Sequence, residues 1–143
     1  VSRTSTGMYR LKKEYHSYVP LLDEKIPDKN NYTENLYVLI NGASGSMANV
    51  VASFIKGNSD AIFIGEESGG TMEGNTSLAY AQLLLPNTKI RVEIPLTKTV
   101  HHVDFIKGRG VFPDYYVTPK IEDILNGIDA ELNFTLNLIT SKK

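Results

Sequence analysis

Two short apolar runs separated by an amphipathic segment constrain this fold most strongly. The runs Tyr37–Ile40 and Ala61–Ile64 are rich in residues that favour buried strands. Between them, apolar residues recur at intervals typical of one helix face, beginning after Ser46 at Met47, Val50, Val51, Phe54 and Ile55. This order predicts a βαβ unit with two parallel strands and a right-handed crossover. Gly57 suits the left-handed position after the last helical turn.

The rest of the chain predicts further elements within a single α/β domain. Leu78–Leu85 and the alternating run Lys89–Ile94 predict a β-hairpin. Thr118 and Asp129 are expected to cap two C-terminal helices. We therefore divide the chain into three parts. Residues 1–36 form an irregular N-terminal segment, residues 37–117 form a core that carries the motifs, and residues 118–143 form a pair of C-terminal helices.

Weaker patterns predict several additional short strands. Loose alternation over residues 8–22 favours one or two strands, and Tyr115–Val117 is expected as a short edge strand. Thr97–Phe105 is a further candidate strand. In such a strand the adjacent His101 and His102 point to opposite faces, so at most one of them would face any given site.

Composition and charge exclude several classes of function. A net charge of −1 with few clusters of basic residues argues against a nucleic-acid partner. The chain has no cysteine and three histidines, a weak basis for zinc, and we expect neither a metal nor a cofactor. No apolar run is long enough for a membrane span. Because the chain begins at Val1 without a signal segment, we expect a fragment or processed form, and the missing cysteines are compatible with an extracytoplasmic location.

Ser46 lies where a predicted strand gives way to a predicted helix. Its hydroxyl would lie beside unpaired backbone N–H groups and the positive end of the helix dipole. Ser46 is therefore a candidate nucleophile, with the N–H of Met47 as an oxyanion donor. A plain N-cap is the alternative, and Ser44 is a second candidate of the same kind. The segment Gly42-Ala-Ser-Gly-Ser46 lacks the last glycine of a nucleophile elbow and the Gly-Lys-Ser/Thr of a phosphate loop.

A glycine-rich loop, Gly65–Gly74, follows the second predicted strand. It holds four glycines in ten residues. In open parallel sheets, ligands bind at the carboxyl ends of the strands, where this loop begins. We therefore expect Gly69, Gly70 and Thr71 to contact a substrate. A flexible loop without a binding role is the alternative.

Three motifs, taken in order, resemble those of the S41 serine peptidases, which include the C-terminal processing (tail-specific) proteases and tricorn-type enzymes. Asn41–Ser46 resembles the family segment Ser-Ala-Ser-Ala-x-Glu, whose second serine is the nucleophile. Ile64–Gly70 is similar to the loop Val-Gly-Glu-x-Thr-x-Gly-Lys, and Gly108–Asp114 is similar to the turn Gly-x-x-Pro-Asp. The resemblance implies a ClpP/crotonase-like fold, a nucleophilic Ser46 and a peptide or protein substrate.

The departures from the family pattern concern the general base. Processing proteases place a lysine base where this chain has Thr71, so a Ser/Lys dyad is excluded, and the family glutamate is replaced by Asn49. Tricorn-like members use a histidine far upstream of the serine, which would lie before Val1. The upstream Gly-Gly turn of the oxyanion hole and any PDZ module are also missing. We expect these residues to form the C-terminal part of a catalytic domain that does not hydrolyse peptides efficiently alone.

Three functional hypotheses follow from this pattern. The first is a serine endopeptidase that acts by acyl transfer from Ser46, with its base outside the chain. The alternative keeps the fold but drops catalysis, leaving a silent domain that binds peptides or apolar ligands. A purely structural role is the third, against which the glycine-rich loop at a strand end argues. Relatives of the tricorn-like branch are often exported, which again suggests an extracytoplasmic location, and the sequence does not indicate an oligomeric state.

Overall fold

The computed structural model describes residues 2–3, 5, 9–14, 26–101 and 103–141. The chain divides into two compact units, Val1–Glu34 and Asn35–Lys143. In the first unit, β1 (Ser2–Arg3) pairs antiparallel with β2 (Tyr9–Arg10). The strand expected within residues 8–22 is thus found at β2, and residues 15–25 lie outside the described part.

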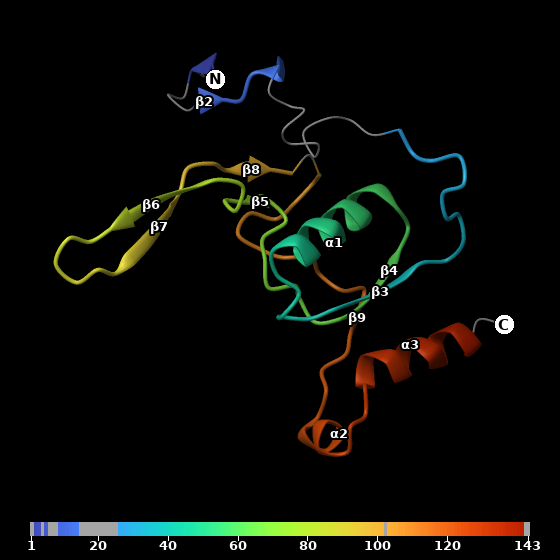
Figure 1. The fold of residues 1–143 in the computed structure, drawn as a ribbon. Helices are drawn as coiled ribbons and strands as arrows, with labels where there is room; N and C mark the ends of the chain where they lie inside the picture. Colours follow the sequence, from blue (N-terminus) through green and yellow to red (C-terminus); the bar gives the residue numbers. More distant parts are fainter. Residues whose placement is uncertain (1, 4, 6–8, 15–25, 102, 142–143) are drawn as a thin grey trace. The chain divides into compact units, whose positions relative to one another are not determined.

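The second unit is built around the predicted βαβ unit, which the structure confirms. The strands β3 (Tyr37–Ile40) and β4 (Ile62–Gly65) run parallel, and α1 (Met47–Asn58) connects them (Figure 1). A third parallel strand, β9 (Tyr115–Tyr116), adds to β4 and gives the order β3-β4-β9. The mixed α/β class and the edge position of the last strand are therefore as predicted.

The prediction that β3 is buried on both faces was wrong. Leu39 is 40% exposed, so the face of β3 on which it lies is not fully covered. The predicted buried face of α1 also differs from the observed one: the buried residues are Asn49, Val50, Ala52 and Ser53, whereas Met47, Val51 and Phe54 are exposed. The helix is apolar on two sides, so periodicity alone did not identify the side that faces the core.

Gly57 lies inside α1 and does not follow it, contrary to expectation. The structure gives a packing reason for a glycine here. A Cβ at this position would lie 2.6 Å from Cγ1 of Val103, a distance at which the two segments could not both stay in place. Gly57 therefore permits a close approach between the helix and the segment that follows β8 (Thr99–Val100).

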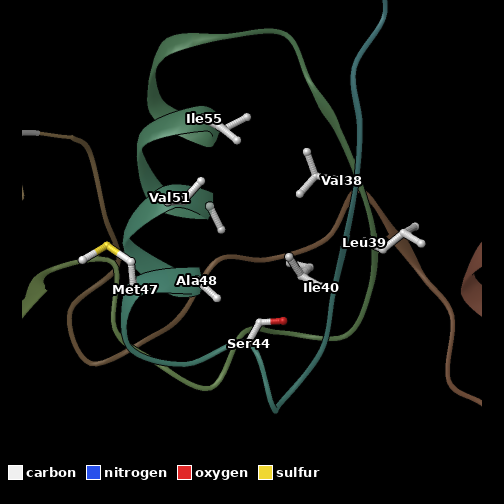
Figure 2. A pocket seen from close by; sticks show the side chains of 9 residues that line it. Val38, Leu39, Ile40, Ser44, Met47, Ala48, Val51 and Ile55 are labelled. Carbon is white, nitrogen blue, oxygen red and sulfur yellow. The ribbon is translucent and has the colours of Figure 1, made fainter. Parts of the chain in front are cut away.

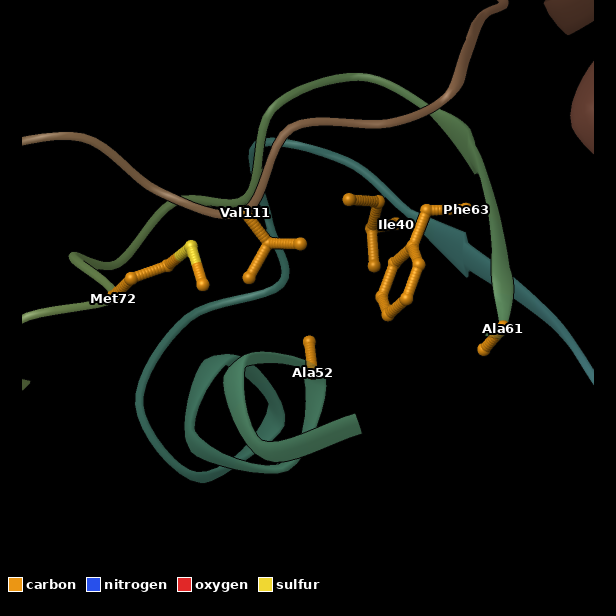
Figure 3. Packing of buried hydrophobic residues seen from close by; sticks show 6 residues of the cluster. All are labelled: Ile40, Ala52, Ala61, Phe63, Met72 and Val111. Carbon is orange, nitrogen blue, oxygen red and sulfur yellow. The ribbon is translucent and has the colours of Figure 1, made fainter. Parts of the chain in front are cut away.

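The hydrophobic core lies between α1, β4 and two loops. Its buried side chains, shown in Figure 3, are Ile40, Ala52, Ala61, Phe63, Met72 and Val111. Phe63 and Val111 are completely buried. Each large side chain of this kind contributes roughly 1.5–3 kcal/mol through burial. The core thus joins the βαβ unit to both the glycine-rich loop and the turn at residues 108–114.

The predicted hairpin is present as β6 (Tyr80–Leu84) and β7 (Arg91–Pro95), paired antiparallel from Tyr80 opposite Pro95 to Leu84 opposite Arg91. Of the strand expected over residues 97–105, the described residues 97–101 and 103–105 show only β8. It pairs with β5 (Gly74–Asn75).

The C-terminal helices are α2 (Ile121–Leu125) and α3 (Ala130–Ser141). Asp129 caps α3 as predicted, since its Oδ1 accepts a hydrogen bond of 2.8 Å from the N–H of Leu132. Thr118 does not cap α2, which begins after Lys120, because its hydroxyl donates to Glu66 instead. No helix in the described ranges is long and apolar enough to cross a membrane.

Asp114 joins the turn at residues 108–114 to β4 and α1. Its carboxylate accepts hydrogen bonds from the backbone N–H of Phe63, at 2.7 Å, and from Nζ of Lys56, at 2.6 Å. Burial acts to raise the pKa of Asp114, but these hydrogen bonds outweigh it and the pKa is lowered. The carboxylate therefore stays ionised while it satisfies a backbone group of the buried Phe63.

Replacing Asp114 with alanine should lower the free energy of unfolding by roughly 1–3 kcal/mol, because the N–H of Phe63 is left without a partner. Asp60→Ala is the matched control, since Asp60 is exposed and has no ion pair or side-chain hydrogen bond in the described structure. Urea unfolding followed by circular dichroism measures both variants. Equal stability of the two would show that Asp114 does not join these segments.

Candidate functional site

Ser46 occupies the N-cap position of α1 in a strained backbone conformation. Its φ is 50° and its ψ is −124°, and positive φ is uncommon for a residue with a side chain. Such a conformation costs about 1–3 kcal/mol and persists only where the surroundings impose it. A serine on a sharp, strained turn between a strand and a helix has the geometry of a nucleophile elbow, although the sequence lacks the last glycine of that motif.

The hydroxyl of Ser46 does not cap the helix. It makes no side-chain cap hydrogen bond, and within the described residues it has no hydrogen-bond partner at all. The residue is exposed. The plain N-cap interpretation therefore does not describe this serine, because its hydroxyl accepts no hydrogen bond from the amides that a cap would satisfy.

Ser44 is used differently, which separates the two candidate serines. Its Oγ accepts a hydrogen bond of 3.1 Å from the N–H of Asn41, and its own N–H donates to the carbonyl of Asn41 at 2.8 Å. Oδ1 of Asn41 accepts from the N–H of Ala43. These bonds build the turn that precedes Ser46, so the hydroxyl of Ser44 is a structural part of it.

The first turn of α1 presents an unused backbone donor. Ala48 N–H bonds to the carbonyl of Gly45 at 3.1 Å and Val50 N–H bonds to that of Ser46 at 3.0 Å, whereas Met47 N–H has no acceptor among the described residues. A free amide at the positive end of a helix can stabilise a developing negative charge. Met47 N–H therefore has the properties of an oxyanion donor.

The glycine-rich loop packs directly behind the turn that carries Ser46. A Cβ on Gly69 would lie 2.1 Å from the carbonyl oxygen of Gly42, and one on Gly70 would lie 2.8 Å from the side-chain amide of Asn49. Only glycine permits these approaches. Thr71 lies next to this contact, with its carbonyl accepting from Nδ2 of Asn49 and its hydroxyl donating to the carbonyl of Gly74. The expected substrate contacts of Gly69, Gly70 and Thr71 stay a prediction.

The loop is fixed in turn by Glu67, which binds the turn at residues 108–114. Its carboxylate accepts from Nε of Arg109 at 2.9 Å, from Nη2 of the same residue, and from the N–H of Gly110 at 2.8 Å. The Arg109 hydrogen bonds, followed by that from Gly110, lower the pKa of Glu67 to about 2. The carboxylate therefore stays ionised, and the ion pair stays formed, down to strongly acidic pH.

A hollow of about 320 Å³ lies between β3 and α1 (Figure 2). Its lining is almost entirely apolar: Val38, Leu39, Ile40, Ser44, Met47, Ala48, Val51, Ala52 and Ile55. Ser44 and Met47, which flank the Ser46 position in sequence, lie at one end of it. An apolar side chain of a ligand would fit this space.

Histidine does not supply a base to Ser46 within the described residues. His16 and His102 lie outside them, and His101 packs against Phe54 with ring centroids 5.3 Å apart. Phe54 is eight residues beyond Ser46 on the same helix, which is about 12 Å along its axis. His101 is buried, and neither ring nitrogen has a partner. Across the described ranges no three His, Asp or Glu side chains form a metal site.

Sequence reasoning missed the buried polar contacts of Asn49. Its Oδ1 accepts a hydrogen bond of 2.6 Å from Oγ of Ser68, and its Nδ2 donates to the carbonyl of Thr71 at 2.8 Å. The available signal was a polar residue, Asn49, within an apolar helix pattern. Such a residue predicts a hydrogen-bond partner in the interior but does not identify that partner.

Comparison with known proteins adds a family assignment. Residues 2–117 match the family model of Peptidase family S41. No curated protein matches the chain.

The ion pair of Glu67 predicts an acid-dependent loss of stability. Because its pKa is about 2 when folded and near 4.5 in an unfolded chain, its contribution is complete above pH 4.5 and is lost as the pH falls towards 2. In Glu67→Gln this contribution is absent, so the free energy of unfolding should change less between pH 5 and pH 2.5 than in the parent protein. Denaturant titrations at each pH measure this difference, and identical slopes would contradict it.

Proposed function

Because the chain belongs to Peptidase family S41, we propose that it carries the nucleophile of a serine endopeptidase, and that this nucleophile is Ser46. The observation that supports the proposal most strongly is the exposed Ser46 hydroxyl, free of a capping bond, on a strained turn at the start of α1. Strain of this kind concentrates at functional sites. An acyl-transfer mechanism uses just such a hydroxyl beside a helix N-terminus.

In the proposed reaction, Oγ of Ser46 attacks the carbonyl carbon of the scissile peptide bond. A general base takes the hydroxyl proton, and Met47 N–H donates a hydrogen bond to the oxyanion of the tetrahedral intermediate. When the intermediate collapses, the base returns the proton to the leaving amine and an acyl group stays on Ser46. A water molecule, deprotonated by the same base, then releases the carboxylic acid and regenerates the serine.

We propose that the general base comes from outside residues 1–143. Thr71 occupies the position of the lysine in processing proteases, and its hydroxyl donates to the Gly74 carbonyl. His101 lies beside Phe54, towards the other end of α1. A histidine contributed from elsewhere, as in tricorn-like relatives, accounts for a serine that has no base in hydrogen-bond reach among the described residues. On this proposal, Gly69, Gly70 and Thr71 contact the peptide near the scissile bond, and the ClpP/crotonase-like fold stays an expectation from the sequence.

A silent peptide- or ligand-binding domain is the second candidate. It is favoured by the same free hydroxyl, which has no base beside it in the described structure, and by the apolar hollow between β3 and α1. Under this alternative, the turn at Ser46 would hold a peptide without cleaving it.

A fluorophosphonate probe distinguishes the two functions in the intact protein. We expect covalent labelling that Ser46→Ala abolishes, because the probe needs an activated hydroxyl and an oxyanion donor. Ser59→Ala is the control, since Ser59 lies exposed at the other end of α1, where its hydroxyl donates to the Ile55 carbonyl and accepts a long hydrogen bond of 3.4 Å from the N–H of Ala61. Labelling that survives in Ser46→Ala and is lost in Ser44→Ala would transfer the role to Ser44. No labelling of the parent protein would favour the binding domain.

A further inference from the structure

Asn49 is a buried polar residue one helical turn beyond Ser46. It is 3% exposed and lies at the third position of α1. A buried side-chain amide is costly unless its oxygen and nitrogen are both hydrogen-bonded. Both are, and neither bond is to the helix itself: Oδ1 accepts from Ser68 at 2.6 Å and Nδ2 donates to the carbonyl of Thr71 at 2.8 Å. Asn49 therefore holds α1 to two points of the glycine-rich loop.

Ser68 extends this connection to a third segment. Its Oγ donates to Asn49 and accepts a hydrogen bond of 2.7 Å from the N–H of Val111, while its own N–H donates to the carbonyl of Val111 at 3.1 Å. Ser68 is 6% exposed and Val111 is completely buried. These hydrogen bonds fix the loop both to the helix and to the turn at residues 108–114.

The loop contacts the strained turn on both sides of Ser46. Gly69 packs against the carbonyl of Gly42, before the serine, and Gly70 packs against the amide of Asn49, after it. Among the described residues, the Ser46 side chain makes no hydrogen bond that would hold its own backbone at a φ of 50°. The conformation must therefore be imposed by the segments that flank it.

We propose that Asn49, together with Ser68, is a positioning residue that holds Ser46 in its strained conformation. The geometry requires an amide at residue 49, because a carboxylate could accept from Ser68 but could not donate to the carbonyl of Thr71. When these bonds are broken, the backbone of Ser46 relaxes to a negative φ. Its hydroxyl then turns to bond the free N–H groups of the helix start and becomes an ordinary N-cap. The catalytic consequence rests on the proposed function, whereas the conformational one does not.

Crystal structures of Asn49→Asp and Ser68→Ala test the conformational part without any need for activity. We expect a negative φ at Ser46 and a hydrogen bond from a first-turn N–H of α1 to its Oγ. The control is Ser53→Ala, which removes a buried hydroxyl from the same helix. Within the described residues, this hydroxyl donates only to the backbone carbonyl of Asn49. A φ of Ser46 that stays near 50° in both Asn49→Asp and Ser68→Ala overturns the proposal. If Asn49→Asp does not fold, Ser68→Ala alone decides it.

The rate of fluorophosphonate labelling tests the catalytic part. In Asn49→Asp and Ser68→Ala, the maximal rate of labelling at saturating probe should fall about tenfold or more, since small displacements of a reacting atom have effects of this size. The half-saturating probe concentration should change little in these two variants. Ser53→Ala should keep the parent labelling rate even if its melting temperature falls as far as theirs. A loss that merely follows melting temperature across all three variants overturns the positioning role. A parent protein that is not labelled refutes the proposed function, and the crystal structures still decide the positioning.

Discussion

The close approach of the glycine-rich loop to the turn before α1 is the constraint on which the rest of the site depends. A side chain at Gly69 or Gly70 would collide with the carbonyl of Gly42 or with the amide of Asn49. The backbone of the glycine-rich loop therefore lies closer to the turn before α1 than side chains at these positions would allow. This contact flanks Ser46 in sequence, and on our proposal it holds the backbone there at a φ of 50° and leaves the hydroxyl exposed.

The loop can act as a support because it is itself fixed by charge and by the core. Glu67 binds Arg109 and the N–H of Gly110, and Met72 places its side chain in the hydrophobic cluster. The turn at residues 108–114 is held to β4 through Asp114. Three segments far apart in sequence thus share one rigid centre. The three segments that resemble motifs of Peptidase family S41 contribute the contacts of this centre, within the residues 2–117 that match the family.

Short-range patterns predicted the architecture well. The apolar runs and the spacing of three and four residues gave the parallel βαβ unit, the alternation at residues 89–94 gave the hairpin, and Asp129 was a correct helix cap. These features depend on residues close together in the chain. The errors came from surroundings that no local pattern reports. Leu39 is exposed because the face of β3 on which it lies is not fully covered, and Gly57 lies within α1, where it leaves room for Val103. Thr118 donates its hydroxyl to Glu66, on a distant loop, instead of capping α2.

The candidate site shows the same division. The position of Ser46 at a strand-to-helix junction could be predicted, because it follows from where the two elements end and begin. Its strained φ and its unbonded hydroxyl could not, since neither follows from the types or the spacing of the residues near it in sequence. The partners of Asn49 were equally hidden, because a buried amide in an apolar helix does not reveal which loop will reach it.

Trapping of a covalent intermediate tests the central proposal most directly. When the intact protein is mixed with an activated peptide ester and quenched with acid, the mass of the protein should rise by that of the acyl group. Peptide mapping should then place this group on Ser46. An acyl group on another residue, or hydrolysis of the ester with no acylated protein at any quench time, would contradict a mechanism in which this strained serine is the nucleophile.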